Sequence, residues 1–398
     1  MSLHILYHHR TQGRGAEAVH ISSIVRALET LGHRVTVVSP PGIDPLDPIQ
    51  STPVDKASVH TGGIQSLWKT ISRQVPNFLF ELAEIGYNLL AYNRLQKILR
   101  TQKIDLIYER YAFYLLAGAL LARRHSIPFV LEANEVSGIS GRARRQSFPR
   151  LCAWFERRLF ARCAGIHTVS SHLQEMILAQ GVDAQRVHVV PNAFDMERVR
   201  GRVRRPALID QFKLHGRVVF GFAGWFDHWD RLDLLFNVFL SLRAKHPQLA
   251  LLLIGDGPGL GELRQRVATE KLAADVILTG AVARRDVLDF IALLDIAVLP
   301  HSNNFGSPVV MFEFMGLGIP VVAPRLGPIL DVMQDGQTAL LFDPLDAAQC
   351  AQAVEKLVTS PGLRRTLSSQ ALAKLLTEHT WLRNAEKILL AAKLAAPA

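Results

Sequence analysis

Residues 4–38 read HILYHHRTQGRGAEAVHISSIVRALETLGHRVTVV. The apolar run at the start predicts a strand over residues 4–7, and a polar, glycine-bearing loop follows it. Apolar residues at helical spacing then predict a helix over 19–31, which Gly32 ends before a second strand over 35–38. Strand, helix and strand in this order form a βαβ unit, and such units build parallel sheets.

The same alternation runs through both halves of the chain. In the first half, further strands are predicted over 104–108, 129–132, 166–169 and 187–190, and helices over 114–124 and from residue 171. In the second half, strands are predicted over 218–223, 249–254, 276–279, 296–300 and 320–323, and helices over 232–245, 260–270, 285–294 and 309–317. The pattern predicts an α/β protein of two doubly wound, Rossmann-like domains that face each other across a cleft.

The length of 398 residues fits two domains better than one, because a single hydrophobic core rarely organises so long a chain. We predict an N-terminal domain over 1–195, an arginine-rich linker over 196–206 and a C-terminal domain over 207–380. Residues 53–100 interrupt the first series with a helical period and large apolar side chains. We expect them to cover the core, with an acceptor pocket or a membrane-facing patch as the alternatives.

Positive charge is concentrated in the first half. The chain carries a net charge of +10, and residues 1–205 hold 27 Lys and Arg against 16 Asp and Glu. The densest group consists of Arg142, Arg144, Arg145, Arg150, Arg157, Arg158 and Arg162. Such a face fits an anionic membrane surface or a phosphorylated acceptor, and a plain solvated surface explains it equally well. We expect no nucleic acid as a partner, because no recognised binding motif accompanies the charge.

Cysteine usage and hydropathy bear on location. The three cysteines show no C-x-x-C spacing, which indicates a reducing compartment and argues against a cysteine-based metal site. The longest apolar runs, such as 115–122, are far shorter than the ~18 to 20 residues of a membrane span. The start of the chain does not resemble a secretory signal. We therefore expect a cytoplasmic protein, or one peripheral to the inner face of a membrane.

Two familiar site types are not supported by the sequence. The turn GDGPGLG at 255–261 does not meet G-x-G-x-x-G, and no G-x-x-x-x-G-K-[ST] loop is present, so an ordinary strand-to-helix turn is favoured. His8, His9 and His301 end predicted strands, but neither histidine nor carboxylate spacing indicates a metal. We expect no metal and no cofactor.

Residues 297–322, AVLPHSNNFGSPVVMFEFMGLGIPVV, hold the predicted ligand site. A strand ends at Pro300, a polar loop follows, and a helix begins near Pro308, a residue suited to a first helical turn. The unpaired N–H groups of that turn, together with the helix dipole, can hold a diphosphate. Glu313 lies amid apolar residues, and a buried carboxylate requires partners. Sugar or ribose hydroxyls would supply them, and a nearby Arg or Lys is the alternative.

Landmarks along the chain include Gly15-Ala-Glu17, Val190-Pro-Asn-Ala193, Gly255-Asp-Gly-Pro258, Phe312-Glu-Phe-Met315 and Gly318-Ile-Pro-Val-Val322. In their identity and order they make the chain similar to the retaining glycosyltransferases of family 4, which have the GT-B fold. The resemblance runs from the first strand to about Trp381. It implies that nucleotide sugar binds mainly to the C-terminal half, and that a helix over 381–398 crosses back to the N-terminal domain.

The resemblance also implies roles for individual residues. Glu313 would hold the nucleotide ribose, and the region that contains Val282 would flank the base. The remaining donor-binding residues implied are Gly306, Ser307, Pro308 and Val309 along the phosphate and sugar, Gly224, and Gly13 and Gly15 in a loop that closes over the donor.

The sequence departs from the family pattern at several of these positions. Phe305 replaces the first Glu of the E-x7-E pattern, so we expect Asn303, Asn304 or backbone groups to hold the donor sugar. Asp230-Arg231 replaces a Lys-Gly pair, and Arg231 would supply the cation from a displaced position. Arg110 and Asn134 stand where the family often has histidine, and we predict them, with Arg231, as the catalytic residues. Glu109, Glu132 and Glu135 are candidates for orienting the acceptor.

The expected function is retaining, metal-independent transfer from a UDP- or GDP-sugar to a lipid-linked, polysaccharide or other glycan acceptor. The altered positions leave a non-catalytic GT-B scaffold, which binds nucleotide sugar or a partner enzyme, as the alternative. A GT-B epimerase or phosphorylase is the third and least favoured reading.

Overall fold

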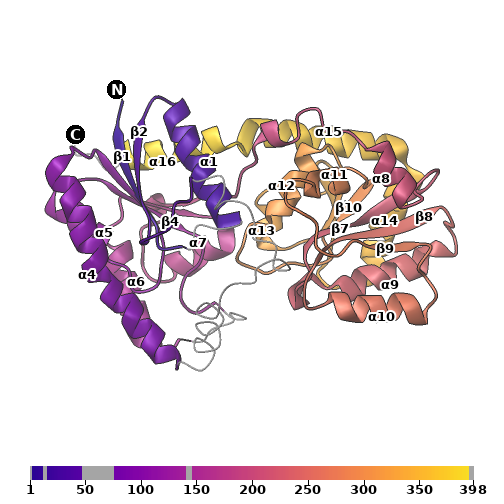
Figure 1. Ribbon diagram of the computed structural model, residues 1–398, viewed down its shortest axis with the longest axis horizontal. Helices are drawn as coiled ribbons and strands as arrows, with labels where there is room; N and C mark the ends of the chain where they lie inside the picture. The colour runs from indigo at the N-terminus through magenta and orange to yellow at the C-terminus, as the bar shows by residue number, and fades with distance from the viewer. Residues whose placement is uncertain (1, 12–15, 47–75, 140–145, 394–398) are drawn as a thin grey trace. The chain divides into compact units, whose positions relative to one another are not determined.

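The computed structural model describes residues 2–11, 16–46, 76–139 and 146–393. These residues form two compact units, each shown with its elements in Figure 1. Unit 1 comprises Met1–Val190 and Trp381–Ala398, and unit 2 comprises Pro191–Thr380. Each unit is built on one parallel six-stranded sheet with helices between the strands. Among the described helices, none is both long enough and apolar enough to span a bilayer.

The sheet of unit 1 has the strand order β2-β1-β3-β4-β5-β6. Its strands are β1 (His4–His8), β2 (Arg34–Val38), β3 (Leu106–Arg110), β4 (Phe129–Ala133), β5 (Gly165–Thr168) and β6 (Val187–Val189). Its helices are α1 (Ala16–Thr30), α4 (Asn77–Thr101), α5 (Ala117–Arg124), α6 (Pro149–Phe160), α7 (Ser171–Leu178), the short η1 (Ala184–Arg186) and α16 (Trp381–Lys393).

Different helices cover the two faces of this sheet. Tyr7 and Tyr108 share a core cluster with residues of α1 and α16. His8 and Glu109 alternate with them along β1 and β3, so they point to the opposite face. There the Glu109 carboxylate lies against Gly118 of α5. The last helix of the chain is therefore part of the core of unit 1.

The sheet of unit 2 has the order β12-β11-β10-β7-β8-β9. Its strands are β7 (Val218–Trp225), β8 (Leu249–Asp256), β9 (Val276–Leu278), β10 (Ile296–Val298), β11 (Val321–Pro324) and β12 (Ala339–Phe342). Its helices are η2 (Met196–Arg198), α8 (Pro206–Gln211), η3 (His228–Asp230), α9 (Leu232–Arg243), α10 (Leu260–Thr269), α11 (Val287–Ile291), α12 (Val309–Gly316), α13 (Gly327–Leu330), α14 (Ala347–Thr359) and α15 (Pro361–Glu378).

The predicted α/β class and the order of the predicted strands and helices are confirmed, and the ends of elements move by three residues or fewer. The helix predicted from residue 114 begins instead at Ala117, because Tyr114 adopts a left-handed backbone with φ of 60°. Of the segment 53–100, residues 77–100 belong to α4. Residues 53–75 lie outside the described part of the chain.

The predicted linker over 196–206 is held on unit 2 by its own arginines. Arg202 and Arg205 form ion pairs with the buried carboxylate of Asp289 at 2.5 and 2.7 Å. Arg204 donates a hydrogen bond to the carbonyl of Leu293, just beyond the end of α11, at 2.7 Å. Because these contacts satisfy a carbonyl that follows α11 and a buried charge, the segment packs as part of unit 2.

Candidate functional site

The loop between β10 and α12 lies at the carboxyl edge of the unit 2 sheet, where doubly wound sheets bind ligands. The Asn303 side chain shapes this loop, since its Oδ1 accepts hydrogen bonds from the N–H groups of Phe305 at 3.2 Å and Gly306 at 2.6 Å. A Cβ atom at Gly306 would lie only 3.0 Å from the same oxygen. Asn304 is exposed beside them.

The next part of the loop is tied to the start of unit 2. Asn192 donates from its backbone N–H to Ser307 Oγ at 3.2 Å and from its side chain to the Ser307 carbonyl at 2.8 Å. Ser307 is buried, Pro308 caps α12 and Val309 is exposed at its first turn. The Val190-Pro-Asn landmark thus fixes the loop that precedes α12.

Glu313 lies one turn into α12 and is nearly buried. Its Oε1 is 3.2 Å from Nη2 of Arg198. Arg198 is the last residue of the short helix η2, near the start of unit 2. The Arg198 guanidinium also lies over the ring of Phe194 at 5.3 Å. Burial raises the pKa of Glu313 above its ordinary value, and the Arg198 guanidinium acts against that rise. Glu313 therefore already has a basic partner, the alternative that sequence analysis left open.

A second guanidinium beside Glu313 was not predicted. Arg284 is half-buried in the loop after β9 and interacts electrostatically with both Arg198 and Glu313. It forms no hydrogen bond or ion pair with any residue that the structure describes. Burial and the like charge of Arg198 lower the pKa of Arg284. A half-buried guanidinium without a partner among the described residues is suited to a ligand that carries phosphate or carbonyl oxygens.

Two other predicted donor residues lie at the ends of β9 and β7 in the same sheet. Val282 packs partly against the core of unit 2 just after β9, and Gly224 is exposed near the end of β7. A Cβ atom at Gly224 would lie 2.9 Å from the Phe222 ring, which explains the glycine. Gly13 and Gly15 lie outside the described residues, as do Arg142, Arg144 and Arg145 of the basic group.

Arg231 has a local partner. Its Nε and Nη2 bond both carboxylate oxygens of Asp233 at 2.9 and 2.8 Å. Its φ of 49° lies in the left-handed region, which accounts for the glycine in the family pattern. The preceding Asp230 accepts the N–H of Asp227 in a capping box, and burial raises the pKa of Asp230 to about 6. Asp230 and Arg231 thus form the turn into α9.

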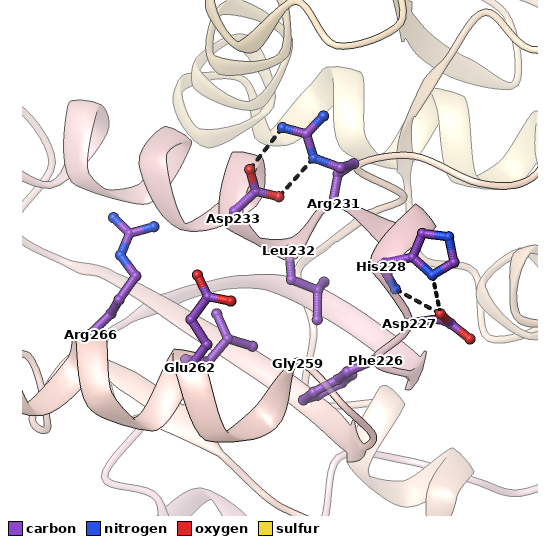
Figure 2. Close-up of a pocket in the computed structure, with 10 residues that line it drawn as sticks. Phe226, Asp227, His228, Arg231, Leu232, Asp233, Gly259, Glu262 and Arg266 are labelled. Carbon is purple, nitrogen blue, oxygen red and sulfur yellow. Dashed lines mark hydrogen bonds and ion pairs between the residues drawn. The ribbon is translucent and has the colours of Figure 1, made fainter.

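Arg231 also lines a pocket of about 330 Å³ between the starts of α9 and α10, drawn in Figure 2. The pair of Arg231 and Asp233 lies on one side, and Glu262 and Arg266 project from α10 on the other. No residue of 303–313 lines this pocket. The structure brings Arg198 and Arg284 to Glu313, and it brings Arg231 to Asp233.

In unit 1, the predicted residues Arg110 and Asn134 meet at Glu132. The Glu132 Oε1 atom lies 2.8 Å from Arg110 Nη1 and 3.0 Å from His20 Nε2, and it also accepts a hydrogen bond from Asn134. Two tyrosine hydroxyls, of Tyr7 and Tyr108, donate to Oε2 at 2.9 and 3.0 Å. Burial alone would raise the pKa of Glu132, but His20 and Arg110 hold it well below its usual value.

The other carboxylates predicted near the acceptor differ in exposure. Glu109 is fully buried and its Oε2 lies 2.6 Å from Nδ1 of His8, so this pair belongs to the interior of unit 1. Glu135 is half-buried after β4. Within the described ranges, no three His, Cys, Asp or Glu side chains gather as metal ligands.

Two doubly wound units of this kind define the GT-B class, and solved structures share the fold of this chain. One is Anabaena Alr3699/HepE in complex with UDP, with a TM-score of 0.70, 18% sequence identity and 99% of this chain and 100% of that chain covered. Another is a glycosyltransferase from Rickettsia africae ESF-5, with a TM-score of 0.76, 12% identity and complete coverage of both chains.

Sequence comparison leads to the family. Residues 17–198 match the model of Glycosyltransferase Family 4, and residues 217–360 match that of Glycosyl transferases group 1. The D-inositol 3-phosphate glycosyltransferase of Pseudarthrobacter chlorophenolicus is 26% identical over 368 residues, which are 88% of this chain and 83% of that protein. The chain belongs to glycosyltransferase family 4, and it is a glycosyltransferase.

Proposed function

We propose that the protein is a retaining, metal-independent transferase that moves a sugar from a UDP- or GDP-sugar to a lipid-linked, polysaccharide or other glycan acceptor. The observation that carries this proposal is the nearly buried Glu313 carboxylate with the half-buried guanidinium of Arg284 beside it. The family membership supports retention, and the similarity to a UDP-bound structure supports a uridine donor.

On this proposal, three groups of unit 2 hold the donor. The Glu313 carboxylate accepts hydrogen bonds from the ribose hydroxyls, as charged acceptors in buried sites do strongly. The free N–H groups at the start of α12, with the positive end of its dipole, face the diphosphate. Arg284 adds a positive charge beside Glu313, so that protein cations would offset the diphosphate and no metal would be needed.

The transfer breaks the bond between the anomeric carbon of the sugar and the phosphate oxygen, and forms a bond from an acceptor oxygen to the same face of that carbon. The acceptor hydroxyl gives its proton to the departing phosphate. Negative charge grows on the diphosphate as the bond breaks, so guanidinium donors fixed nearby stabilise the transition state more than the ground state.

The donor sugar requires polar contacts that Phe305 does not supply. Asn303 uses its Oδ1 within the loop, which leaves its Nδ2 for a sugar hydroxyl, and Asn304 is exposed next to it. Phe305 is also the observation that favours a second candidate, a non-catalytic protein that binds nucleotide sugar without transferring it. We place this second because Glu313 and its surroundings retain donor-binding chemistry.

A donor panel separates the two candidates. Calorimetry with UDP- and GDP-sugars should reveal one donor that binds, and the same donor incubated with membrane extract should lose its labelled sugar to an acceptor. NMR of the product should show the anomeric configuration of the donor. Binding without transfer or hydrolysis would favour the second candidate, and no binding across the panel would contradict both. We further propose that the acceptor is reached at the inner face of a membrane.

A further inference from the structure

The solvent face of α4 is apolar over the first half of the helix. Five large side chains with exposed fractions between 41 and 74% share this face, namely Phe78, Leu79, Leu82, Leu89 and Leu90. At 100° per residue they cover one side of the helix, together with the exposed Ala83 and Gly86. Of the two acidic residues here, Glu81 is buried and Glu84 pairs with Arg10 at 3.0 Å. A surface helix of a water-facing protein normally carries charged side chains on this side.

The start of α6 continues the apolar surface. Phe148, Leu151 and Trp154 are each exposed by 38 to 42%. The Phe148 N–H donates to the Glu81 carboxylate of α4 at 3.0 Å, so the N-terminal ends of α4 and α6 lie next to each other, as Figure 1 also shows. With Leu120 of α5, these three helices and the N-cap residue Phe148 carry nine of the eighteen exposed large hydrophobic side chains found among the described residues. Exposed apolar area of this extent marks an interaction surface.

The same helices have a strong excess of positive charge. Within their bounds, α4, α5 and α6 contain eight Lys and Arg and three Asp and Glu. Glu81 and Glu156 are buried and Glu84 is paired, so the acidic residues of the three helices leave the cations of the surface unbalanced. Arg158 lies over the ring of Trp154 at 5.0 Å, which places a cation directly on the apolar patch.

We propose that α4, α5 and α6 of unit 1 form a docking surface for an anionic lipid bilayer. The leucines, Phe78 and Trp154 would enter the headgroup region, while exposed cations such as Arg157 and Arg158 would meet lipid phosphates. A second copy of this chain fits the surface less well, because it would bring the same positive charge against itself. That the bilayer also presents a lipid-linked acceptor rests on the proposed function. The docking of unit 1 to the bilayer does not depend on that function.

Vesicle sedimentation tests the proposal with the full-length protein. We expect it to pellet with vesicles of phosphatidylcholine and phosphatidylglycerol in equal parts and to stay in solution with phosphatidylcholine alone. Binding should weaken as salt is added, since surface charges are screened. The pair Arg157→Gln and Arg158→Gln should lower the partition coefficient by about tenfold, and the pair Leu82→Glu and Leu89→Glu should abolish binding.

Leu390→Glu is the matched control, because Leu390 is exposed by 59% on α16, the helix on the opposite face of the sheet. It should bind vesicles as the unchanged protein does. Thermal unfolding of each variant checks that the fold is intact. Bromine-labelled lipids should quench the fluorescence of the unchanged protein, and the variant Trp154→Phe should lose most of that quenching because the ring at this position enters the bilayer.

Three results would overturn the inference. The first is equal binding to neutral and anionic vesicles. The second is loss of vesicle binding in Leu390→Glu but not in the double variant Leu82→Glu and Leu89→Glu. The third is a protein that does not bind vesicles but forms a dimer, which the double variant dissociates. Donor calorimetry on the same samples keeps the two proposals separate. Donor binding without vesicle binding contradicts only the docking surface, and vesicle binding without donor binding contradicts only the donor site.

Discussion

Arg198 and Glu313 form an ion pair of 3.2 Å although 115 positions separate them in the chain. Arg198 belongs to the segment that leads into unit 2, and Glu313 belongs to α12 at the ligand edge of its sheet. The charge of the buried carboxylate therefore depends on a residue far away in sequence.

Changing Glu313 to Gln should weaken nucleotide-sugar binding by about tenfold or more, because hydrogen bonds to a charged acceptor contribute about 1.5–3 kcal/mol. Calorimetric titration with the donor that binds the unchanged protein measures the effect. Glu262→Gln is the control, since Glu262 lines the pocket of Figure 2 rather than the loop before α12. Equal affinity of the Glu313→Gln variant and the unchanged protein would remove Glu313 from the donor site.

Changing Arg198 to Gln should move the pH dependence of donor binding. Only the ionised Glu313 accepts hydrogen bonds from both ribose hydroxyls, so binding weakens as pH falls through its pKa. Burial raises that pKa and Arg198 lowers it, so the variant should have a higher pKa and lose affinity at a higher pH. Dissociation constants measured across pH would show the shift, and superimposable profiles would show that Arg198 does not support the charge of Glu313.

Removing the Glu132 carboxylate should destabilise unit 1. Glu132→Ala leaves Arg110 and His20 without their buried partner. We expect this change to lower the free energy of unfolding by about 3–5 kcal/mol. Thermal unfolding at neutral pH measures the loss, and Glu175→Ala on the exposed side of α7 should have little effect.

The pH dependence of stability gives a second readout for Glu132. The pKa of Glu132 is lower in the folded protein than in the unfolded chain, where it is about 4.3. The contribution of Glu132 to stability is therefore complete above about pH 4.3 and is lost as the pH falls through the pKa of the folded state. The unchanged protein should therefore lose more stability than Glu132→Ala on acidification below about pH 4. If the stability of the two proteins fell in parallel as the pH is lowered, Glu132 would not be ionised in the folded protein.

A small side chain at Gly118 should also be destabilising. An added Cβ would lie 2.1 Å from Glu109 Oε2, in a buried site that already holds the pair with His8. We expect Gly118→Ala to lower stability by about 1–3 kcal/mol, the usual cost of overpacking. Gly261→Ala in α10 has open space around it and should raise stability by about 0.4–1 kcal/mol. Chemical denaturation of the two variants should show changes of opposite sign in the free energy of unfolding. If Gly118→Ala left that free energy unchanged, the Glu109 side chain would be free to move away from the added methyl group.

The sequence was most informative about the sheets. Strands buried on both faces read as nearly continuous apolar runs, as Leu249–Asp256 does, and the glycines between them mark the turns. The loop before α12 and the position of Glu313 could be predicted for the same reason, because the end of a strand and the start of a helix are local signals. The roles implied for Glu313, Gly306 and Ser307 remain predictions.

Long-range pairing was not accessible from the sequence. A run of arginines after residue 196 has the composition of a linker, and only the structure shows that Asp289 and Glu313 hold three of them. Arg284 follows Val282 by two positions, so an arginine in the predicted base-flanking loop was the one available signal. The role predicted for Arg231 depends on its resemblance to a family lysine. No local pattern in the sequence indicates that Arg231 Nε and Nη2 bind the Asp233 carboxylate.

The helix α16 completes unit 1 although unit 2 separates it from the rest of that unit in the chain. Ala385 and Ile388 pack with Tyr7 and Tyr108, and a Cβ at Gly165 would lie 2.7 Å from Ala391 Cβ. On the ribosome, residues 1–190 therefore emerge with one sheet face covered only in part, by α1, while residues 191–380 can close their own core as soon as they are made. The half of the protein that is synthesised first is the half that finishes folding last.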